Sequence, residues 1–224
     1  MNNLENKLDN SFSQLQEKVY QAKTIHLHYS MLERHKSFLI RQAVLSIYAA
    51  WEGLLKECLL LYLQELNTLK LEYNDISDTY LAFQTDSVCE FKSNVAHYKT
   101  ITKRSKKLFD MYKQKVSFDT KINVESNANL KITNTLLAKL SLSILESKYE
   151  RDLDRLLFFR NSVAHGDSDN IRIEQKDWDK FSATVQDIGS DLITSILDGE
   201  TIGVRVKLFP CSHCSSVEIR AITL

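Results

Sequence analysis

The sequence predicts an all-α protein that ends in a short β-hairpin-like tail. Apolar residues recur every three to four positions over most of the 224 residues, which is the period of helices with a buried face. One proline and five glycines leave few positions that would break a helix. Hydrophobic residues make up 43% and charged residues 26%, as in folded globular proteins. We therefore expect a helical domain over residues 1–198 and a small β-like appendage over residues 199–224.

Two helices are expected in the first third of the chain. Residues 4–29 repeat apolar positions at amphipathic-helix spacing. Residues 33–66 are apolar on more than one side, and such a helix is buried in a core or shared with a partner subunit. Large apolar residues at this spacing, such as Trp51, are expected to be core packing.

The middle of the chain alternates helices with polar connections. Ser77 and Asp78 supply turn and N-cap chemistry before a short helix. Residues 99–115 hold seven lysines and arginines against one acid, with Tyr98 directly before them and Phe109 and Tyr112 interleaved. Residues 116–131 are rich in asparagine and suit a loop or an extended segment. A helix is expected to resume over residues 133–142.

Two further helices precede the tail. Residues 149–165 again follow helical spacing, and Gly166 is the expected stop. A last helix is expected over residues 174–197. Residues 201–209 then alternate apolar and polar side chains as a strand does, and residues 216–224 do so more loosely, so the two could pair as a hairpin.

Charge and cysteine usage restrict the class of protein. Lys+Arg and Asp+Glu balance at 29 each, so attraction to nucleic acid must come from local patches. No stretch reaches membrane-spanning length without charges, and the N-terminus lacks the features of a signal peptide. Four cysteines in a chain of this length favour reduced thiols. We expect a cytoplasmic protein that does not engage a membrane.

One short motif carries the candidate chemistry. Arg160, Asn161 and His165 form Arg-Asn-x3-His directly before Gly166. This pattern resembles the Arg-x4–6-His motif of the HEPN superfamily, whose ribonucleases often carry Asn or Asp after the arginine. So short a match also fits a helix C-terminus whose basic residues complement the helix dipole.

The surroundings extend the resemblance over residues 33–197. Residues 47–57 read Ile-Tyr-Ala-Ala-Trp-Glu-Gly-Leu-Leu-Lys-Glu, which is similar to the Tyr-Ala-x-Trp-Glu-Gly-Phe stretch of one stand-alone HEPN nuclease branch. That branch also has an asparagine-rich connector, as in residues 125–130. The resemblance implies a HEPN-type helical bundle and a homodimer whose two motifs face each other across a two-fold axis. It further implies that Glu52, buried in the second helix, orients Arg160.

The motif residues suit RNA cleavage independently of the resemblance. Attack by the 2′-hydroxyl on the neighbouring phosphate needs a proton acceptor, a proton donor and a cation, but no metal. His165 could act as base or acid, and the guanidinium of Arg160 could grip two phosphate oxygens. Asn161 stands four residues before His165, so its amide could hold the imidazole. We expect no cofactor.

A second set of residues is expected to bind the RNA backbone, although a solvated helix face would look the same in sequence. These residues are Lys103, Arg104, Lys106 and Lys107. Cys211, His213 and Cys214 resemble half of a zinc site, but no second pair of ligands follows, so we expect no metal.

Together these observations predict a metal-independent endoribonuclease that acts on RNA such as tRNA or mRNA. By resemblance it would be a toxin or antiviral effector with an antitoxin or regulatory protein as partner. Several HEPN toxins are neutralised when a partner nucleotidyltransferase attaches a nucleotide to the tyrosine of a His-x-Tyr motif. In this chain Gly166 and Asp167 follow His165, so that tyrosine is missing. The alternatives are a non-catalytic HEPN module that binds a nucleotide or docks on a protein, and a zinc-stapled adaptor.

Overall fold

The computed structural model describes residues 3–28, 32–89, 98–122, 124, 127–165 and 173–203. Within these ranges the protein is helical and contains no strand, which confirms the all-α prediction. The elements in chain order are α1 (Asn3–Thr24), the 3-10 turn η1 (Ile25–Leu27), α2 (Glu33–Thr68), α3 (Asp78–Cys89), α4 (Tyr98–Met111), α5 (Leu130–Lys139), the 3-10 turn η2 (Ser147–Tyr149), α6 (Glu150–His165) and α7 (Gln175–Gly203).

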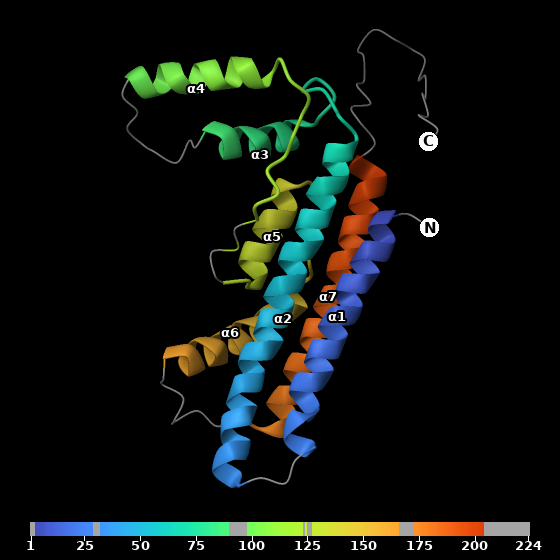
Figure 1. Cartoon of the computed structure of the whole chain (residues 1–224), viewed down its shortest axis with the longest axis vertical. Helices are drawn as coiled ribbons and strands as arrows, with labels where there is room; N and C mark the ends of the chain where they lie inside the picture. Colours follow the sequence, from blue (N-terminus) through green and yellow to red (C-terminus); the bar gives the residue numbers. More distant parts are fainter. Residues whose placement is uncertain are drawn as a thin grey trace.

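Three long helices form the body of the molecule. α1, α2 and α7 lie side by side and contact one another pairwise (Figure 1). α6 packs across α2 and α7, and α5 contacts α6. α3 and α4 pack on each other near the C-terminal end of α2. The N-terminal end of α2 lies at the opposite end of the molecule (Figure 1).

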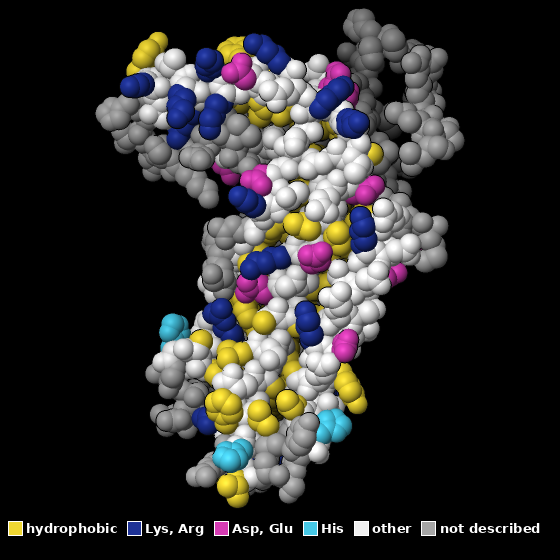
Figure 2. Space-filling view, in the orientation of Figure 1, with side chains coloured by type: hydrophobic (Ala, Val, Ile, Leu, Met, Phe, Trp, Pro, Cys, Tyr) yellow, Lys and Arg dark blue, Asp and Glu magenta, His cyan; other side chains and the backbone are white. Residues whose placement is uncertain are grey.

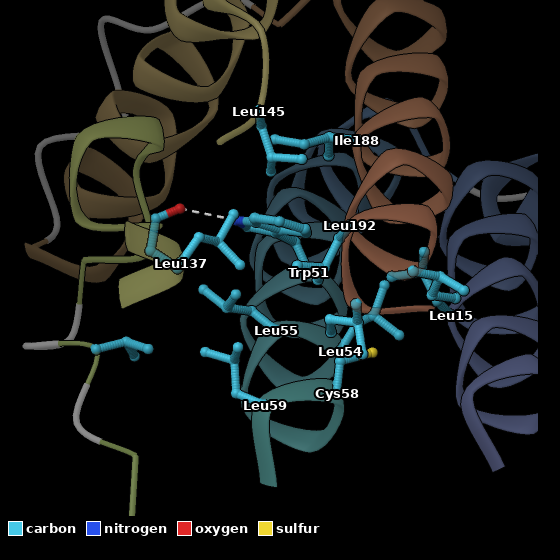
Figure 3. Packing of buried hydrophobic residues seen from close by; sticks show 14 of the residues in the cluster. Leu15, Trp51, Leu54, Leu55, Cys58, Leu59, Leu137, Leu145, Ile188 and Leu192 are labelled. Carbon is cyan, nitrogen blue, oxygen red and sulfur yellow. Dashed lines mark hydrogen bonds between the residues drawn. The ribbon is translucent and has the colours of Figure 1, made fainter. Parts of the chain in front are cut away.

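Most apolar side chains of α2 from Ala43 onward are buried within this single chain, because α1, α7 and α6 all contact it, whereas Phe38 near its start is 55% exposed. Trp51 has no exposed surface, which confirms its predicted place in the core. Figure 3 shows its ring among Leu145, Ile188 and Leu192, and the dashed line marks the bond from its Nε1 to the carbonyl oxygen of Ala128, at 2.7 Å. The core therefore explains why α2 is apolar on more than one side.

The bounds of α5 differ from the prediction at both ends. The helix starts at Leu130, three residues early, because the Asn129 side chain caps it by accepting from the backbone N–H of Ile132 at 2.9 Å. It ends at Lys139 rather than at residue 142. Ser141 adopts a left-handed conformation with φ 54°, and the N–H of Leu142 donates to the carbonyl of Leu137, as in a Schellman end.

The predicted strand beginning at residue 201 is wrong over residues 201–203, which continue α7. The helix is packed against α1 and α2, and extending an existing helix costs little compared with starting a strand. Gly166, the rest of the predicted hairpin, and Cys211, His213 and Cys214 lie outside the described residues. None of the described helices is both long and apolar enough to cross a bilayer.

Candidate functional site

An open cavity of about 560 Å³ lies between α2 and α6. It is lined by Leu45, Tyr48, Ala49, Glu52, Gly53 and Lys56 of α2 and by Arg160, Ala164 and His165 of α6. Three of the four predicted catalytic residues thus line one cavity: Glu52, Arg160 and His165. Another hollow, of about 450 Å³ between α1 and α2, has a single charged side chain, Lys18, and offers no comparable chemistry.

The α2 wall of the cavity is one stripe of the helix. Its residues recur at steps of three, four, seven, eight and eleven from Leu45, which places their side chains on the same face. Gly53 leaves space in the middle of this wall, since a Cβ there would meet nothing within 4 Å. The cavity is therefore roomy at its α2 side and charged at its rim.

Arg160 is held at two points. Its guanidinium carbon lies 5.1 Å from the centroid of the Tyr48 ring, within the range of a cation–π contact. Its Nη1 donates to Oδ1 of Asn161 at 2.8 Å. A guanidinium has five N–H donors, so these contacts leave others for the oxygens of a phosphate.

The predicted contact between Asn161 and His165 is not made. The amide oxygen of Asn161 accepts from Arg160, and among the described residues no hydrogen bond joins it to the imidazole. The four-residue spacing allows the second contact, but a bond from a charged donor is the stronger one and the long Arg160 side chain can reach it. His165 is exposed at the last position of α6.

Tyr48 joins the cavity to the connector before α5, and the sequence analysis did not identify it as a site residue. It is buried, and its hydroxyl oxygen accepts from the backbone N–H of Ala128 at 2.7 Å. Because Trp51 donates to the carbonyl of the same residue, α2 fixes both polar groups of Ala128. Burial raises the pKa of the Tyr48 hydroxyl; the Ala128 N–H and Arg160 act in the opposite sense, while Glu52 adds to the rise through its charge and a hydrogen bond.

Glu52 occupies a different setting from the one predicted. Its side chain is 18% exposed rather than fully buried, and its Oε1 lies 2.5 Å from Nζ of Lys56. In the part of the chain that the structure describes, no ion pair connects it to Arg160; the two residues are linked through Tyr48 instead. Lys56 is a further cavity residue that the sequence analysis missed, although its four-residue spacing from Glu52 was a signal.

The predicted RNA-backbone residues Lys103, Arg104, Lys106 and Lys107 all lie on α4. α4 lies beside the C-terminal end of α2, whereas Glu52 lies near the middle of α2 (Figure 1). The sixteen residues from Glu52 to Thr68 correspond to about 24 Å along the helix axis. These four residues and the cavity are therefore separate places on one chain.

The described residues contain no group of three or more His, Cys, Asp or Glu side chains arranged to hold a metal ion. Cys58 is a free, buried thiol, and burial raises its pKa to about 12.

One family model matches the chain. It is described as HEPN_MAE_28990-like HEPN and covers residues 4–200, which include both walls of the cavity. No curated protein and no solved structure matches. The match confirms the HEPN membership that residues 33–197 suggested and extends it to α1. The chain belongs to the HEPN_MAE_28990-like HEPN family.

Proposed function

We propose that this HEPN protein is a metal-independent endoribonuclease that cuts RNA in the cavity between α2 and α6. The observation that carries the proposal is that one open cavity of about 560 Å³ is lined by Arg160, His165, Glu52 and Lys56 together. It thus has an imidazole, two cations and a carboxylate around a space large enough for a nucleotide.

The reaction follows from these groups. The 2′-oxygen of the RNA forms a bond to phosphorus while the bond from phosphorus to the 5′-oxygen breaks. A base takes the 2′-hydroxyl proton and an acid protonates the leaving 5′-oxygen, which gives a 2′,3′-cyclic phosphate and a 5′-hydroxyl. Arg160 stabilises the charge that develops on the phosphate oxygens, with Tyr48 holding its guanidinium in place. His165 serves as the acid or the base.

One imidazole cannot do both proton transfers in the same step, so the proposal includes a homodimer. Phe158 is 59% exposed, and it shares a face of α6 with Asn161 and His165, which follow it by three and seven residues. A two-fold contact at this face buries Phe158 and brings two copies of His165 together. Phe158→Asp is expected to yield monomers in light scattering, and a dimer that persists in this variant would place the interface elsewhere.

The resemblance supplies the biological setting of the proposal: a toxin or antiviral effector that acts on tRNA or mRNA and is restrained by an antitoxin or regulatory protein. The biochemical test uses mixed RNA, which contains both of these targets.

The test is cleavage of total cellular RNA and tRNA in excess EDTA. His165→Ala is expected to lose activity at least a hundredfold, as is usual when a general acid–base group is removed. Arg160→Ala is expected to lose a similar factor, because it removes the cation that stabilises charge on the phosphate oxygens. Arg151→Ala and His28→Ala are matched controls, because both residues are exposed and neither lines the cavity. Equal cleavage by His165→Ala would refute the proposal. Tight RNA or nucleotide binding with no cleavage by the folded wild type would favour the non-catalytic HEPN module.

A further inference from the structure

α4 presents an exposed apolar stripe to solvent. Its large apolar residues are Tyr98, Ile101 and Phe109, with exposed fractions of 84%, 48% and 72%, and Tyr112, directly after the helix, is 49% exposed. The N–H of Tyr112 donates to the carbonyl of Leu108 at 3.1 Å, so the helical geometry continues to it. Apolar side chains this exposed on one short helix are a sign of an interaction surface.

The four residues lie on one face of α4. At about 100° of rotation per residue they fall within a sector of about 80°. The neighbouring sector holds Met111, which is buried, and Leu108, which is half-buried, on the side where α4 packs on α3. α3 therefore covers one side of α4 and leaves the stripe open.

Lysines border the stripe on its other edge. Lys99 and Lys106 are seven residues apart, exposed, and adjacent to the stripe by helical rotation. Lys103 and Lys107 point further round the helix, and Arg104 is half-buried on the α3 side. Figure 2 shows Lys and Arg side chains gathered along α4 at the top of the molecule. α4 holds five Lys or Arg residues and one acid, in a chain whose charges balance as a whole, so this surface attracts an anionic partner.

A polar hollow lies at the C-terminal end of the stripe. It has a volume of about 250 Å³ and is lined by Tyr73, Tyr112, Asn74, Gln114, Lys113, Lys115 and Glu72. Lys115 pairs with Glu72 at 2.6 Å, and Nζ of Lys113 lies 3.7 Å from Oδ1 of Asp110. The rings of Tyr73 and Tyr112 are 5.0 Å apart. The hollow thus offers the exposed ring of Tyr112, with amide and ammonium groups beside it and with the Glu72 carboxylate paired to Lys115. An aromatic ring beside amide and ammonium groups can hold a nucleobase and its phosphate.

We propose that this surface, formed by Tyr98, Ile101, Phe109 and Tyr112 with Lys99 and Lys106 along its edge, binds single-stranded RNA at a distance from the cavity. Aromatic side chains stack on bases and the neighbouring lysines contact phosphates, a pattern common to single-strand binding surfaces. A membrane surface fits less well, because the apolar face of an amphipathic helix is about 100° wide or more, whereas this stripe fills about 80° and Ser105 lies within it.

The biological role of this surface rests on the proposed ribonuclease function, whereas RNA binding by the surface can be tested without cleavage. The surface lies beside the C-terminal end of α2 (Figure 1), and that end is about 24 Å from Glu52 along the helix axis. A long RNA strand can contact both places, while a dinucleoside phosphate can occupy only the cavity. The α4 surface thus selects long unpaired RNA as the substrate class and holds it near the cavity.

The first experiment measures binding without cleavage. A fluorescent, fully 2′-O-methylated single strand cannot be cut by its own 2′-oxygens, so anisotropy reports binding by the whole protein. Phe109→Ala is expected to raise Kd about tenfold, which corresponds to one lost stacking contact. Phe109→Leu keeps the apolar area but has no ring, and it is expected to behave like Phe109→Ala. Tyr20→Ala, another exposed aromatic substitution, is the control and leaves Kd unchanged.

Salt dependence tests the lysines. Replacing Lys99 and Lys106 together with alanine is expected to reduce the slope of log Kd against log salt by about 1.4, from about 0.7 for each phosphate contact on a single strand. Lys7→Ala, an exposed lysine on α1, is the control. In cleavage assays the α4 variants lower kcat/KM on a long RNA about tenfold and leave cleavage of a dinucleoside phosphate unchanged.

Three outcomes would overturn the proposal: α4 variants that bind RNA as the controls do, Phe109→Leu that binds as the wild type does, or α4-dependent sedimentation with phosphatidylserine vesicles in place of RNA binding. Normal binding with no cleavage by any form refutes only the ribonuclease activity. Cleavage with no α4 dependence refutes only this surface.

Discussion

The hydroxyl of Tyr48 is expected to stabilise the fold as well as the cavity. Tyr48→Phe keeps the ring that lies 5.1 Å from the Arg160 guanidinium but leaves the N–H of Ala128, a residue 1% exposed, without its acceptor. A buried donor left unpaired costs about 1–3 kcal/mol. In a chain of this size each kcal/mol lowers Tm by about 2–4 °C, so we expect Tm to fall by about 2–12 °C.

Urea and thermal unfolding, followed by tryptophan fluorescence and circular dichroism, measure this loss. Tyr20→Phe is the matched control, because Tyr20 is 62% exposed, and its free energy of unfolding is expected to stay within about 0.5 kcal/mol of wild type. The hydroxyl of Tyr48 accepts from the N–H of Ala128, and Nε1 of Trp51 donates to the carbonyl of the same residue. A double-mutant cycle with Trp51→Phe is therefore expected to give a coupling energy above about 0.5 kcal/mol.

The argument would be refuted if Tyr48→Phe unfolded as the wild type does, or if the two substitutions added independently. Tyr48→Leu separates the second role of this side chain, because it also removes the ring beside Arg160. We expect Tyr48→Leu to lower RNA cleavage further than Tyr48→Phe does, by about the 0.5–2 kcal/mol of a cation–π contact. Equal cleavage by the two variants would show that the ring does not position Arg160.

Two glycines and one cysteine give further predictions. Gly53→Ala is expected to stabilise the protein by about 0.5–1 kcal/mol, because the new Cβ meets no atom within 4 Å. Gly189→Ala is expected to destabilise it by about 1–3 kcal/mol, because the new Cβ would lie 2.9 Å from Leu54. Urea unfolding measures both changes. Burial raises the pKa of Cys58 from 9.0 to about 12, so the unfolded thiol ionises first as pH rises. The contribution of this thiol to the free energy of unfolding is fully present below pH 9.0. It is lost between pH 9.0 and about pH 12, at up to about 1.4 kcal/mol per pH unit. The free energy of unfolding, measured at increasing pH, should fall more steeply over this range in the wild type than in Cys58→Ala. The same dependence on pH in both proteins would contradict the prediction.

The helices could be predicted because their apolar periodicity is local. α2 and α6 appeared at nearly their observed bounds for this reason. The ends of α5 depend on single caps, and the Asn129 cap was readable in the sequence, whereas the left-handed Ser141 was not. Residues 201–203 continue the helix that precedes them, which alternation in a short window does not reveal.

Residue spacing predicted the site only where it is contiguous, and Glu52 on α2 was predicted from the family resemblance. Arg160 and His165 stand in one motif, so the sequence showed them together, but Tyr48 and Lys56 face them only after α2 and α6 pack. Spacing showed that Asn161 could reach an imidazole, not that Arg160 would compete for the same oxygen. The basic stretch looked uniform in sequence, and the α4 helix distributes its charges around more than one face.

The ends of the RNA fragments test the central claim most directly. Wild-type protein is incubated with RNA in excess EDTA, and the fragments are analysed by mass spectrometry beside those from His165→Ala. We predict 2′,3′-cyclic phosphates and 5′-hydroxyls from the wild type and no such ends from the variant. Fragments with 3′-hydroxyl and 5′-phosphate ends, or the same cyclic ends from His165→Ala, would contradict the assignment of the α2–α6 cavity as a ribonuclease site.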